Sequence, residues 1–198
     1  MRTGLFGGSF NPIHKGHIAL AKTVMEQLLL DRVILIPSGE SPYKSSADYA
    51  PARDRLEMCR LSAEDEPNFE VSSFETDREG KSYSIYTAEY FKEKYPRDEL
   101  YWLVGSDMLL YFDKWYRYQD ILKLVSLAAV TRTGGDETQL MHTAHNLKKY
   151  GSILVVHHRP LVISSTEIRK MIKNNEDLSC YLNEKVVQYI KMRFLYTD

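Results

Sequence analysis

Glycines, a proline and two histidines stand close together near the start of the chain, in an order that suits phosphate binding. The segment reads Gly7-Gly8-Ser9-Phe10-Asn11-Pro12-Ile13-His14-Lys15-Gly16-His17. Glycines let backbone N–H groups approach a ligand without a Cβ in the way. The residues from 17 to 30 have the apolar spacing of a helix, and a helix start is a ready anion site because its first N–H groups are unpaired. Two imidazoles at such a start can donate hydrogen bonds to phosphate oxygens, and a bound phosphate can raise their pKa until they are cationic.

Two other interpretations of this segment are weaker. A turn followed by polar helix caps would explain a lone glycine pair, but it does not explain the full ordered string between a strand and a helix. A zinc site built on His14 and His17 lacks an evident third ligand nearby. The segment therefore predicts a phosphate-binding loop.

A second candidate anion site follows the last predicted strand, at Ile163-Ser164-Ser165-Thr166-Glu167-Ile168-Arg169. Ser164 and Glu167 have the spacing of a capping box, which predicts a helix start. The cap does not explain Arg169, because a cation in the first turns opposes the helix dipole at a cost of up to about 1 kcal/mol. A bound anion would remove that conflict, so the hydroxyls, amides and guanidinium predict a polyphosphate receptor.

Strand and helix patterns alternate along the chain and must position these two segments. Apolar runs predict strands at residues 3–6, 32–36, 69–72, 100–104, 127–131 and 153–156. Helical spacing predicts helices at 17–30, 53–63, 84–95, 139–150, 166–173 and 184–193, with a shorter one ending at 121–124. This alternation predicts an α/β fold with a doubly wound parallel sheet. Ligands of such sheets bind beyond the carboxyl ends of the strands, so the two segments are expected to meet at one edge.

Composition limits the class of protein. The chain has 198 residues, of which 43% are hydrophobic, and its 26 basic and 27 acidic side chains leave a formal net charge of −1. Near-zero charge argues against a general nucleic-acid or membrane-surface binder. Two cysteines exclude a disulfide framework and a four-thiolate zinc site, and no apolar run suits a signal peptide or a membrane span. We expect a single cytoplasmic domain over residues 1–198, with a small C-terminal helical extension and with self-association into a homo-oligomer left open.

The two segments together resemble the paired signatures of the nucleotidylyltransferase superfamily, HxGH and ISSTxIR. Members of that superfamily transfer a nucleotidyl group to a phosphate or carboxylate and release pyrophosphate, and the second signature holds the β- and γ-phosphates of ATP. The resemblance implies a Rossmann-like sheet. It also implies ATP binding at Gly7, Gly8, Ser9, Phe10, Ile163, Ser164, Ser165 and Thr166.

Central segments resemble the bacterial nicotinate-nucleotide adenylyltransferases in particular. Four segments look like this family's PPHK-like, REGPSYT-like, GxDxxxxxxxWY and RPG segments, namely residues 41–44, 78–84, 105–116 and 132–134. The resemblance covers nearly the whole chain and implies that ATP and nicotinate mononucleotide are joined into nicotinate adenine dinucleotide. The chain departs from the family at Tyr43, where His is usual, at Asn11, where Asp is common, and at Phe194, where Gly is usual.

The resemblance also implies a role for individual residues. On the nicotinate side, Trp115 would stack on the ring, and the backbone amides of Ser84 and Tyr116 would hold its carboxylate. On the ATP side, Asp107 would bond ribose hydroxyls, Gly105 would also bind ATP, and Arg132 would lie by the nucleotide phosphates. The catalytic group would comprise His14, His17, Lys44 and Arg169, with Mg²⁺ bound through the substrate phosphates and no metal held by the protein alone.

Alternatives exist for several of these residues and for the function. Trp115 could be a core residue, and Asp107 could cap the helix after Gly105. The histidine pair at 142 and 145 favours an exposed helix face over a metal site, and the pair at 157 and 158 is interpreted as following the last strand. Another acceptor, nicotinamide mononucleotide or phosphopantetheine, is the nearest alternative function. A non-catalytic nucleotide sensor and a tRNA-handling module are the others.

Overall fold

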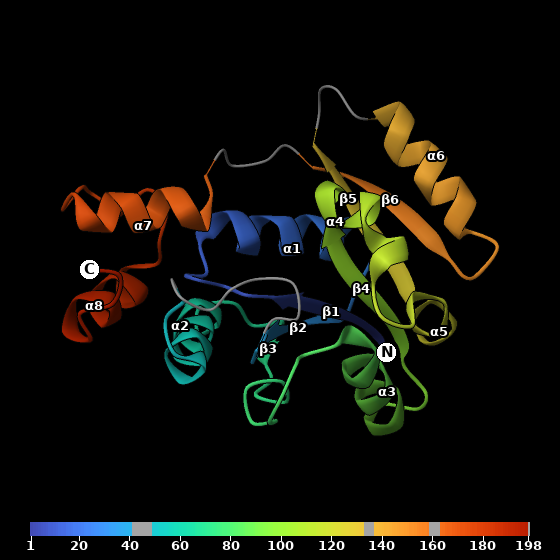
Figure 1. Ribbon diagram of the computed structural model, residues 1–198, viewed down its shortest axis with the longest axis horizontal. Coiled ribbons are helices and arrows are strands. Elements are labelled where there is room, and N and C mark those ends of the chain that lie inside the picture. The colour runs from blue at the N-terminus through green and yellow to red at the C-terminus, as the bar shows by residue number, and fades with distance from the viewer. Residues whose placement is uncertain (41–48, 133–136, 159–162, 198) are drawn as a thin grey trace. The chain divides into compact units, whose positions relative to one another are not determined.

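A parallel sheet forms the framework of the protein. The computed structural model describes residues 1–40, 49–132, 137–158 and 163–197, with only the backbone described at 132 and 137. In these residues the strands are β1 (Arg2–Gly8), β2 (Arg32–Pro37), β3 (Phe69–Val71), β4 (Glu99–Gly105), β5 (Ser126–Arg132) and β6 (Ile153–His158). They form one six-stranded sheet in the order β3-β2-β1-β4-β5-β6 (Figure 1). The predicted Rossmann-like parallel sheet is confirmed.

Helices connect the strands, as the alternating pattern predicted. They are α1 (Lys15–Gln27), α2 (Ala52–Ala63), α3 (Ser84–Lys94), α4 (Ser106–Leu110), the 3₁₀ turn η1 (Phe112–Lys114), α5 (Tyr118–Leu124), α6 (Glu137–Leu147), α7 (Ser165–Lys173) and α8 (Glu184–Met192). The first helix begins at Lys15, two residues before the expected start, so His17 lies in its first turn. The last strand continues to His158, so the interpretation that the histidines at 157 and 158 follow it is wrong.

Contacts between residues divide the chain into two compact units, each made of three segments. Unit 1 comprises Met1–Gly7, Leu20–Ile34 and Tyr83–Pro160, and unit 2 comprises Gly8–Ala19, Leu35–Ser82 and Leu161–Asp198. Each unit has its own buried apolar residues. The single-domain organisation stays a prediction.

Unit 1 is built around β4 and β5, whose central residues are buried almost completely. Leu5 of β1 is in register with Trp102 of β4, and Trp102 is in register with Leu127 of β5. Both strands are continuous apolar runs because strands of a parallel sheet are covered on both faces. Helix α6 packs against β6, and α3 contacts α5 (Figure 1). The carboxyl ends of β1, β4 and β5 therefore lie along one edge of the sheet in this unit.

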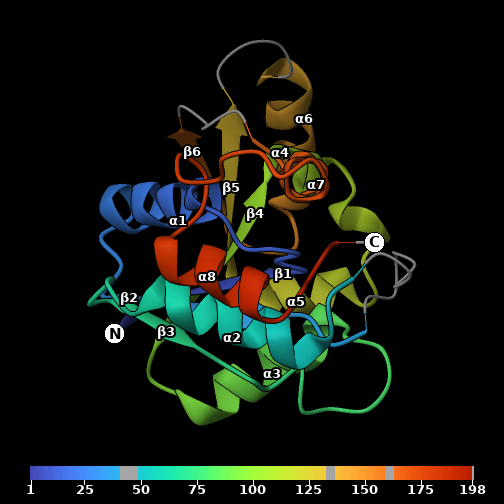
Figure 2. The same ribbon diagram turned by 90° about the vertical axis from the view of Figure 1, so that its left-hand side faces the viewer.

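Unit 2 is held together by α2 and α8, which lie side by side (Figure 2). Leu56, Met58 and Cys59 of α2 and Val186 and Ile190 of α8 are buried. A buried carboxylate, Asp54, adds a polar contact by accepting hydrogen bonds from Tyr189 and Arg193 at 2.8 and 3.3 Å.

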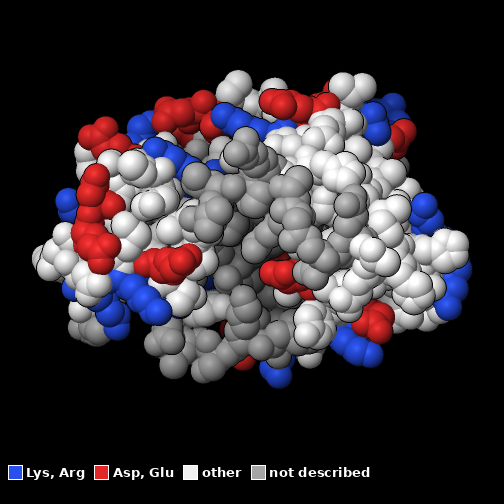
Figure 3. Space-filling model, turned by 90° about the horizontal axis from the view of Figure 1, so that it is seen from above, with Lys and Arg blue, Asp and Glu red and all other residues white. Residues whose placement is uncertain are grey.

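Acidic and basic side chains are intermixed on the face of the molecule shown in Figure 3, as the balanced composition suggests. Within the ranges that the structure covers, no helix combines the length and the apolar character needed to traverse a bilayer.

Candidate nucleotide-binding site

Two glycines flank the loop between β1 and α1 and lie close to aromatic side chains of that loop. A Cβ on Gly8 would lie 3.1 Å from the ring of Phe10, and a Cβ on Gly16 would lie 3.0 Å from Nδ1 of His14. Phe10 is buried and has a positive φ of 44°. A side chain at either glycine would therefore have to displace a neighbouring aromatic ring by a few tenths of an ångström.

The two histidines of this loop interact directly. Their rings stack with centroids 3.7 Å apart and planes 26° apart. The backbone N–H of His14 donates to Nδ1 of His17 over 3.2 Å. Because a neutral imidazole accepts at one nitrogen and carries its proton on the other, this contact puts the proton of His17 on Nε2. Nδ1 of His14 is buried and lacks a hydrogen-bond partner within the described part of the chain.

Burial keeps both imidazoles neutral. It lowers the pKa of His14 from 6.5 to about 4, and burial together with the neighbouring His14 lowers the pKa of His17 well below 6.5. At pH 7 the pair therefore supplies hydrogen-bond donors and no positive charge. The cationic form that the sequence suggested requires a bound anion, whose negative charge favours protonation.

Helix α7 begins with the capping box that the sequence predicted. The hydroxyl of Ser164 accepts from the backbone N–H of Glu167 over 3.2 Å, and the Glu167 carboxylate accepts from the Ser164 backbone at 2.8 Å and from its hydroxyl at 2.7 Å. These hydrogen bonds lower the pKa of Glu167, so the carboxylate is ionised at the positive end of the helix. Thr166 is exposed in the same turn, and Ile163 is half-buried just before it.

The two signature segments contact each other within unit 2, although more than 150 residues separate them in the sequence. Nη1 of Arg169 donates to the backbone carbonyl of Asn11 over 3.0 Å, and the hydroxyl of Ser165 donates to the carbonyl of Pro12 over 2.9 Å. Nη2 of Arg169 is 3.4 Å from the hydroxyl of Thr166. The expectation that the two segments meet is therefore confirmed by direct hydrogen bonds. Unit 2 brings together Gly8, Ser9, Phe10, His14, His17, Ile163, Ser164, Ser165, Thr166 and Arg169.

A buried arginine that sequence reasoning missed ties three loop segments of unit 2 together. Arg55 of α2 is 2% exposed, and its guanidinium donates to the carbonyls of Ser9, Gly39 and Ala50 at 2.7, 3.1 and 3.0 Å. The sequence placed Arg55 in a helix but gave no signal of its burial, because Arg usually lies on exposed helix faces. Its hydrogen bonds fix the backbone that follows β1.

The other predicted ATP-side residues belong to unit 1. A Cβ on Gly7 would lie 3.2 Å from the ring of Trp102, so packing inside the unit explains this glycine. Gly105 ends β4 and is the N-cap of α4, whereas Asp107 is the second helical residue and is exposed. The alternative that Asp107 caps this helix is therefore wrong, since the chain enters the helix at Gly105 without a side-chain cap.

All three residues predicted to bind nicotinate lie in unit 1, and two of them are aromatic. Trp115 is half-buried, and its ring is tilted against Phe112 at 4.9 Å and lies edge-on to Trp102 at 6.4 Å. Tyr116 is 48% exposed. Ser84 is the first residue of α3, a position whose backbone N–H has no partner within the helix.

Some predicted site residues lie outside the described residues. These are Lys44 with the rest of its loop, residues 133–134 of the RPG-like turn, and the side chain of Arg132. The backbone of Arg132 ends β5.

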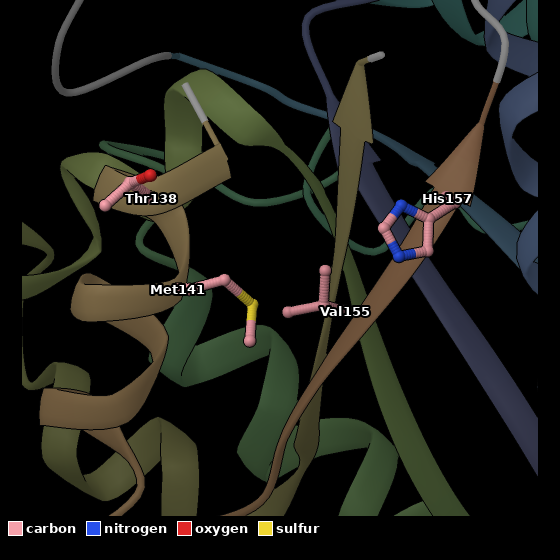
Figure 4. A pocket seen from close by; sticks show the side chains of 4 residues that line it. All are labelled: Thr138, Met141, Val155 and His157. Atoms are coloured by element: carbon pink, nitrogen blue, oxygen red, sulfur yellow. The ribbon is translucent and has the colours of Figure 1, made fainter. Parts of the chain in front are cut away.

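The other candidate sites have fewer groups that could bind a ligand or take part in a reaction. A hollow of about 650 Å³ is lined by Thr138, Met141, Val155 and His157, and Figure 4 shows Met141 extending toward Val155. Among the predicted site residues whose side chains the structure describes, none lines it. Among the described residues, no three His, Cys, Asp or Glu side chains are grouped to hold a metal ion. The histidines at 142 and 145 are exposed on α6.

Comparison with known proteins gives the same family as the sequence signatures. The family model described as cytidylyltransferase-like matches residues 5–171. A protein of Caldicellulosiruptor saccharolyticus named "Probable nicotinate-nucleotide adenylyltransferase" is 38% identical over 200 residues, which cover 100% of each chain. The "Nicotinate-nucleotide adenylyltransferase" of Bacillus subtilis is 31% identical over 195 residues, or 98% of each chain. This chain belongs to the nicotinate-nucleotide adenylyltransferase family.

Solved structures of nicotinate-nucleotide adenylyltransferases have the same fold. The nicotinic acid mononucleotide adenylyltransferase of Plasmodium falciparum, solved in complex with NaAD, superposes with a TM-score of 0.77. It is 17% identical, and the match covers 98% of this chain and 97% of that one. A putative nicotinate-nucleotide adenylyltransferase of Vibrio parahaemolyticus gives a TM-score of 0.69 at 18% identity, with 100% and 97% covered. These likenesses support the Rossmann-like architecture of the family member described here.

Proposed function

We propose that the protein transfers the adenylyl group of ATP to nicotinate mononucleotide, giving nicotinate adenine dinucleotide and pyrophosphate for NAD biosynthesis. The observation that carries the proposal is the contact between the histidine loop and the start of α7, through Arg169 and Ser165, in a chain that matches named adenylyltransferases over its full length. This contact joins imidazoles, hydroxyls, amides and a guanidinium in one unit, which is a donor set suited to a triphosphate.

The triphosphate of ATP would lie along this donor set. His14 and His17 hold α- and β-phosphate oxygens, and the neutral His17 carries its proton on Nε2. Arg169 and the Ser164–Thr166 turn hold the β- and γ-phosphates, supported by Gly8, Ser9 and Phe10 from the first loop. Lys44 supplies positive charge to the leaving pyrophosphate.

The reaction needs positioning and charge neutralisation more than proton transfer. The attacking group is a phosphate oxygen of the mononucleotide, and a phosphate monoester with a second pKa near roughly 6 is largely ionised at pH 7. A bond forms from this oxygen to the α-phosphorus while the bond to the bridging oxygen breaks, and pyrophosphate leaves. No general base is required, so the site has to bring two anions together and stabilise charge on the transferred group.

The donor set of unit 2 fits a metal-bearing nucleotide. The residues offered are hydrogen-bond donors to anions, and the described residues hold no three-membered group of metal ligands. Mg²⁺, when bound with the substrate phosphates, would supply positive charge that neutralises part of their negative charge. The residues of unit 2 would then donate hydrogen bonds to the phosphate oxygens of the same nucleotide.

The residues of unit 1 would bind the nucleosides. Trp115 presents a ring braced by Phe112 and Trp102, which suits stacking on a flat pyridine ring. The backbone amides of Ser84 and Tyr116 hold the carboxylate that distinguishes nicotinate from nicotinamide. The ATP side is served by Gly105, Asp107 and Arg132 at the carboxyl ends of β4 and β5.

Cytoplasmic localisation stays a prediction, as does the absence of nucleic acid and membrane among the partners. Assembly into a homo-oligomer is likewise left to measurement.

Pyrophosphate release from ATP tests the function. The purified protein is assayed with nicotinate mononucleotide, nicotinamide mononucleotide and phosphopantetheine in parallel. The proposal requires the highest kcat/KM with nicotinate mononucleotide. ATP binding without pyrophosphate release from any acceptor would instead indicate a nucleotide sensor, and a preference for either other acceptor would reassign the substrate.

A further inference from the structure

Asn11 connects three parts of unit 2. Its side-chain oxygen accepts from the hydroxyl of Tyr196 at 2.8 Å and from the backbone N–H of Ala50 at 3.0 Å. Its backbone carbonyl accepts from Nη1 of Arg169 at 3.0 Å. Asn11 is 1% exposed, so its side of each contact is buried, whereas Tyr196 and Arg169 are half-buried.

Tyr196 reaches Asn11 from the segment that follows α8. Its φ is +63°, and its phenol lies in the electrostatic field of Arg55 and Arg169. Burial raises the pKa of this phenol, so the hydroxyl keeps its proton and donates throughout the neutral range. The hydroxyl of Tyr196 therefore stays protonated and can act as the donor to the side chain of Asn11.

The loop that receives this hydrogen bond has little regular structure of its own. Residues 9–14 lie between the end of β1 and the start of α1. Backbone carbonyls of the loop are held instead by side chains from elsewhere in unit 2: Ser9 by Arg55, Asn11 by Arg169 and Pro12 by Ser165. A side-chain contact that fixes the loop therefore also fixes the residues that it carries.

We propose that Tyr196 is a positioning residue for the phosphate-binding loop: its hydroxyl fixes the side chain of Asn11, whose backbone carbonyl holds Arg169. The predicted effect on turnover rests on the proposed function, because Arg169 and the loop histidines act there on the triphosphate. The predicted effect on the loop itself does not depend on that function.

Tyr189 provides a matched control. Its hydroxyl donates to Asp54 at 2.8 Å, the same length as the Tyr196 contact, and it also tethers the end of the chain to the body of unit 2. Within the described residues, the side chain of Tyr189 makes no hydrogen bond to the phosphate loop or to α7. Tyr189→Phe and Tyr196→Phe each remove one hydroxyl from a comparable tether, so a merely structural role predicts similar behaviour of the two variants.

The first measurement compares turnover. Tyr196→Phe is expected to lower kcat for pyrophosphate release about five- to tenfold, the range of one lost hydrogen bond, with KM for nicotinate mononucleotide changed less than about twofold. Tyr189→Phe is expected to keep kcat within about twofold of the parent. Equal kcat values for the two variants would overturn the proposal.

The second measurement reads the loop directly. Hydrogen–deuterium exchange at the amides of residues 9–17 is expected to be faster in Tyr196→Phe than in the parent, and unchanged in Tyr189→Phe. Parent-like exchange in Tyr196→Phe would overturn the proposal. A parent protein that releases no pyrophosphate would refute the proposed function, and the exchange experiment would still decide the role of Tyr196.

Coupling to Asn11 completes the test. Asn11→Asp keeps a side-chain acceptor, so Tyr196→Phe is expected to accelerate exchange in that background as it does in the parent. Asn11→Ala removes the acceptor, so adding Tyr196→Phe should then have no further effect. Additive effects with Asn11→Ala would overturn the route through Asn11. If Asn11→Ala does not fold, the Asn11→Asp background decides: no effect of Tyr196→Phe there would also overturn the route through Asn11.

Discussion

The backbone N–H of His14 donates to the ring of His17, and the two rings stack at 3.7 Å. The backbone N–H of His14 fixes the tautomer of His17. Because the rings are so close, it is unfavourable for both of them to carry a positive charge. The pair therefore enters the proposed reaction as a neutral donor array. A bound polyphosphate would be what draws a proton onto it.

Replacing His17 with Ala is expected to lower kcat for pyrophosphate release by about 10²-fold and to raise KM for ATP much less. The physical reason is that a donor aimed at the α-phosphoryl group contributes most as negative charge develops in the transition state. Steady-state kinetics with ATP varied will measure both parameters. His142→Ala, on the exposed face of α6, is the matched control and should retain parental kcat. A kcat for His17→Ala equal to that of the control would remove His17 from the catalytic group.

With His14 replaced by Gln, the free energy of unfolding is expected to fall less when the pH is lowered. The folded-state pKa of about 4 lies below the unfolded value of 6.5, so the unfolded chain binds protons more readily as the pH falls from 6.5 toward 4. From these values, His14 makes the free energy of unfolding about 2 kcal/mol lower at pH 5 than at pH 7.5. Urea unfolding at both pH values measures the difference, which should shrink by about that amount in His14→Gln. An unchanged difference would contradict the burial of His14 as a neutral group.

Replacing Trp115 with Ala is expected to raise KM for nicotinate mononucleotide about tenfold, because one aromatic contact is worth roughly 1 kcal/mol or slightly more. KM for ATP should change little. Trp115→Phe keeps a flat ring and should recover most of the affinity, which separates stacking from support of the neighbouring Phe112 and Trp102. An effect confined to ATP would show that Trp115 does not bind the pyridine ring.

Replacing Arg55 with Met is expected to lower the free energy of unfolding by about 3 kcal/mol, because three backbone carbonyls lose a charged donor in a buried position. Arg60→Met on the same helix is the control. Arg60 is exposed, its contact to Glu57 is 3.3 Å, and its loss should cost less than about 0.5 kcal/mol. Chemical denaturation of both variants gives the comparison. Similar losses would mean that the carbonyl contacts of Arg55 add nothing to stability.

The sequence predicted the sheet and the start of α7 well because these depend on local patterns. Apolar runs marked every strand of the described sheet, and the spacing of Ser164 and Glu167 marked the capping box. The predicted ends of the helices and strands were less accurate. α1 begins at Lys15 although the apolar periodicity became visible only at residue 17, and β6 extends over two polar residues that pair with β5.

The parts of the site that could not be predicted depend on tertiary contacts. Arg55 looks like any helical arginine until three carbonyls are found around it. Asn11 stood out only as a replacement for a common Asp, yet its side chain accepts a hydrogen bond from Tyr196, 185 residues away in the chain. The lowered pKa of His14 follows from burial, which local spacing does not reveal. Each of these features depends on contacts or burial that a side chain acquires only in the folded protein.

The interleaving of the two compact units has a consequence for their independence. Each unit is assembled from three stretches of chain, and α1 contributes residues to both of them. No single cut in the polypeptide can release either half intact, so neither could be expressed from a continuous stretch of coding sequence. A chimera of two relatives that exchanged one unit would have to exchange several alternating segments of the chain. The histidine loop and the aromatic cluster around Trp115 are therefore expected to be inherited together.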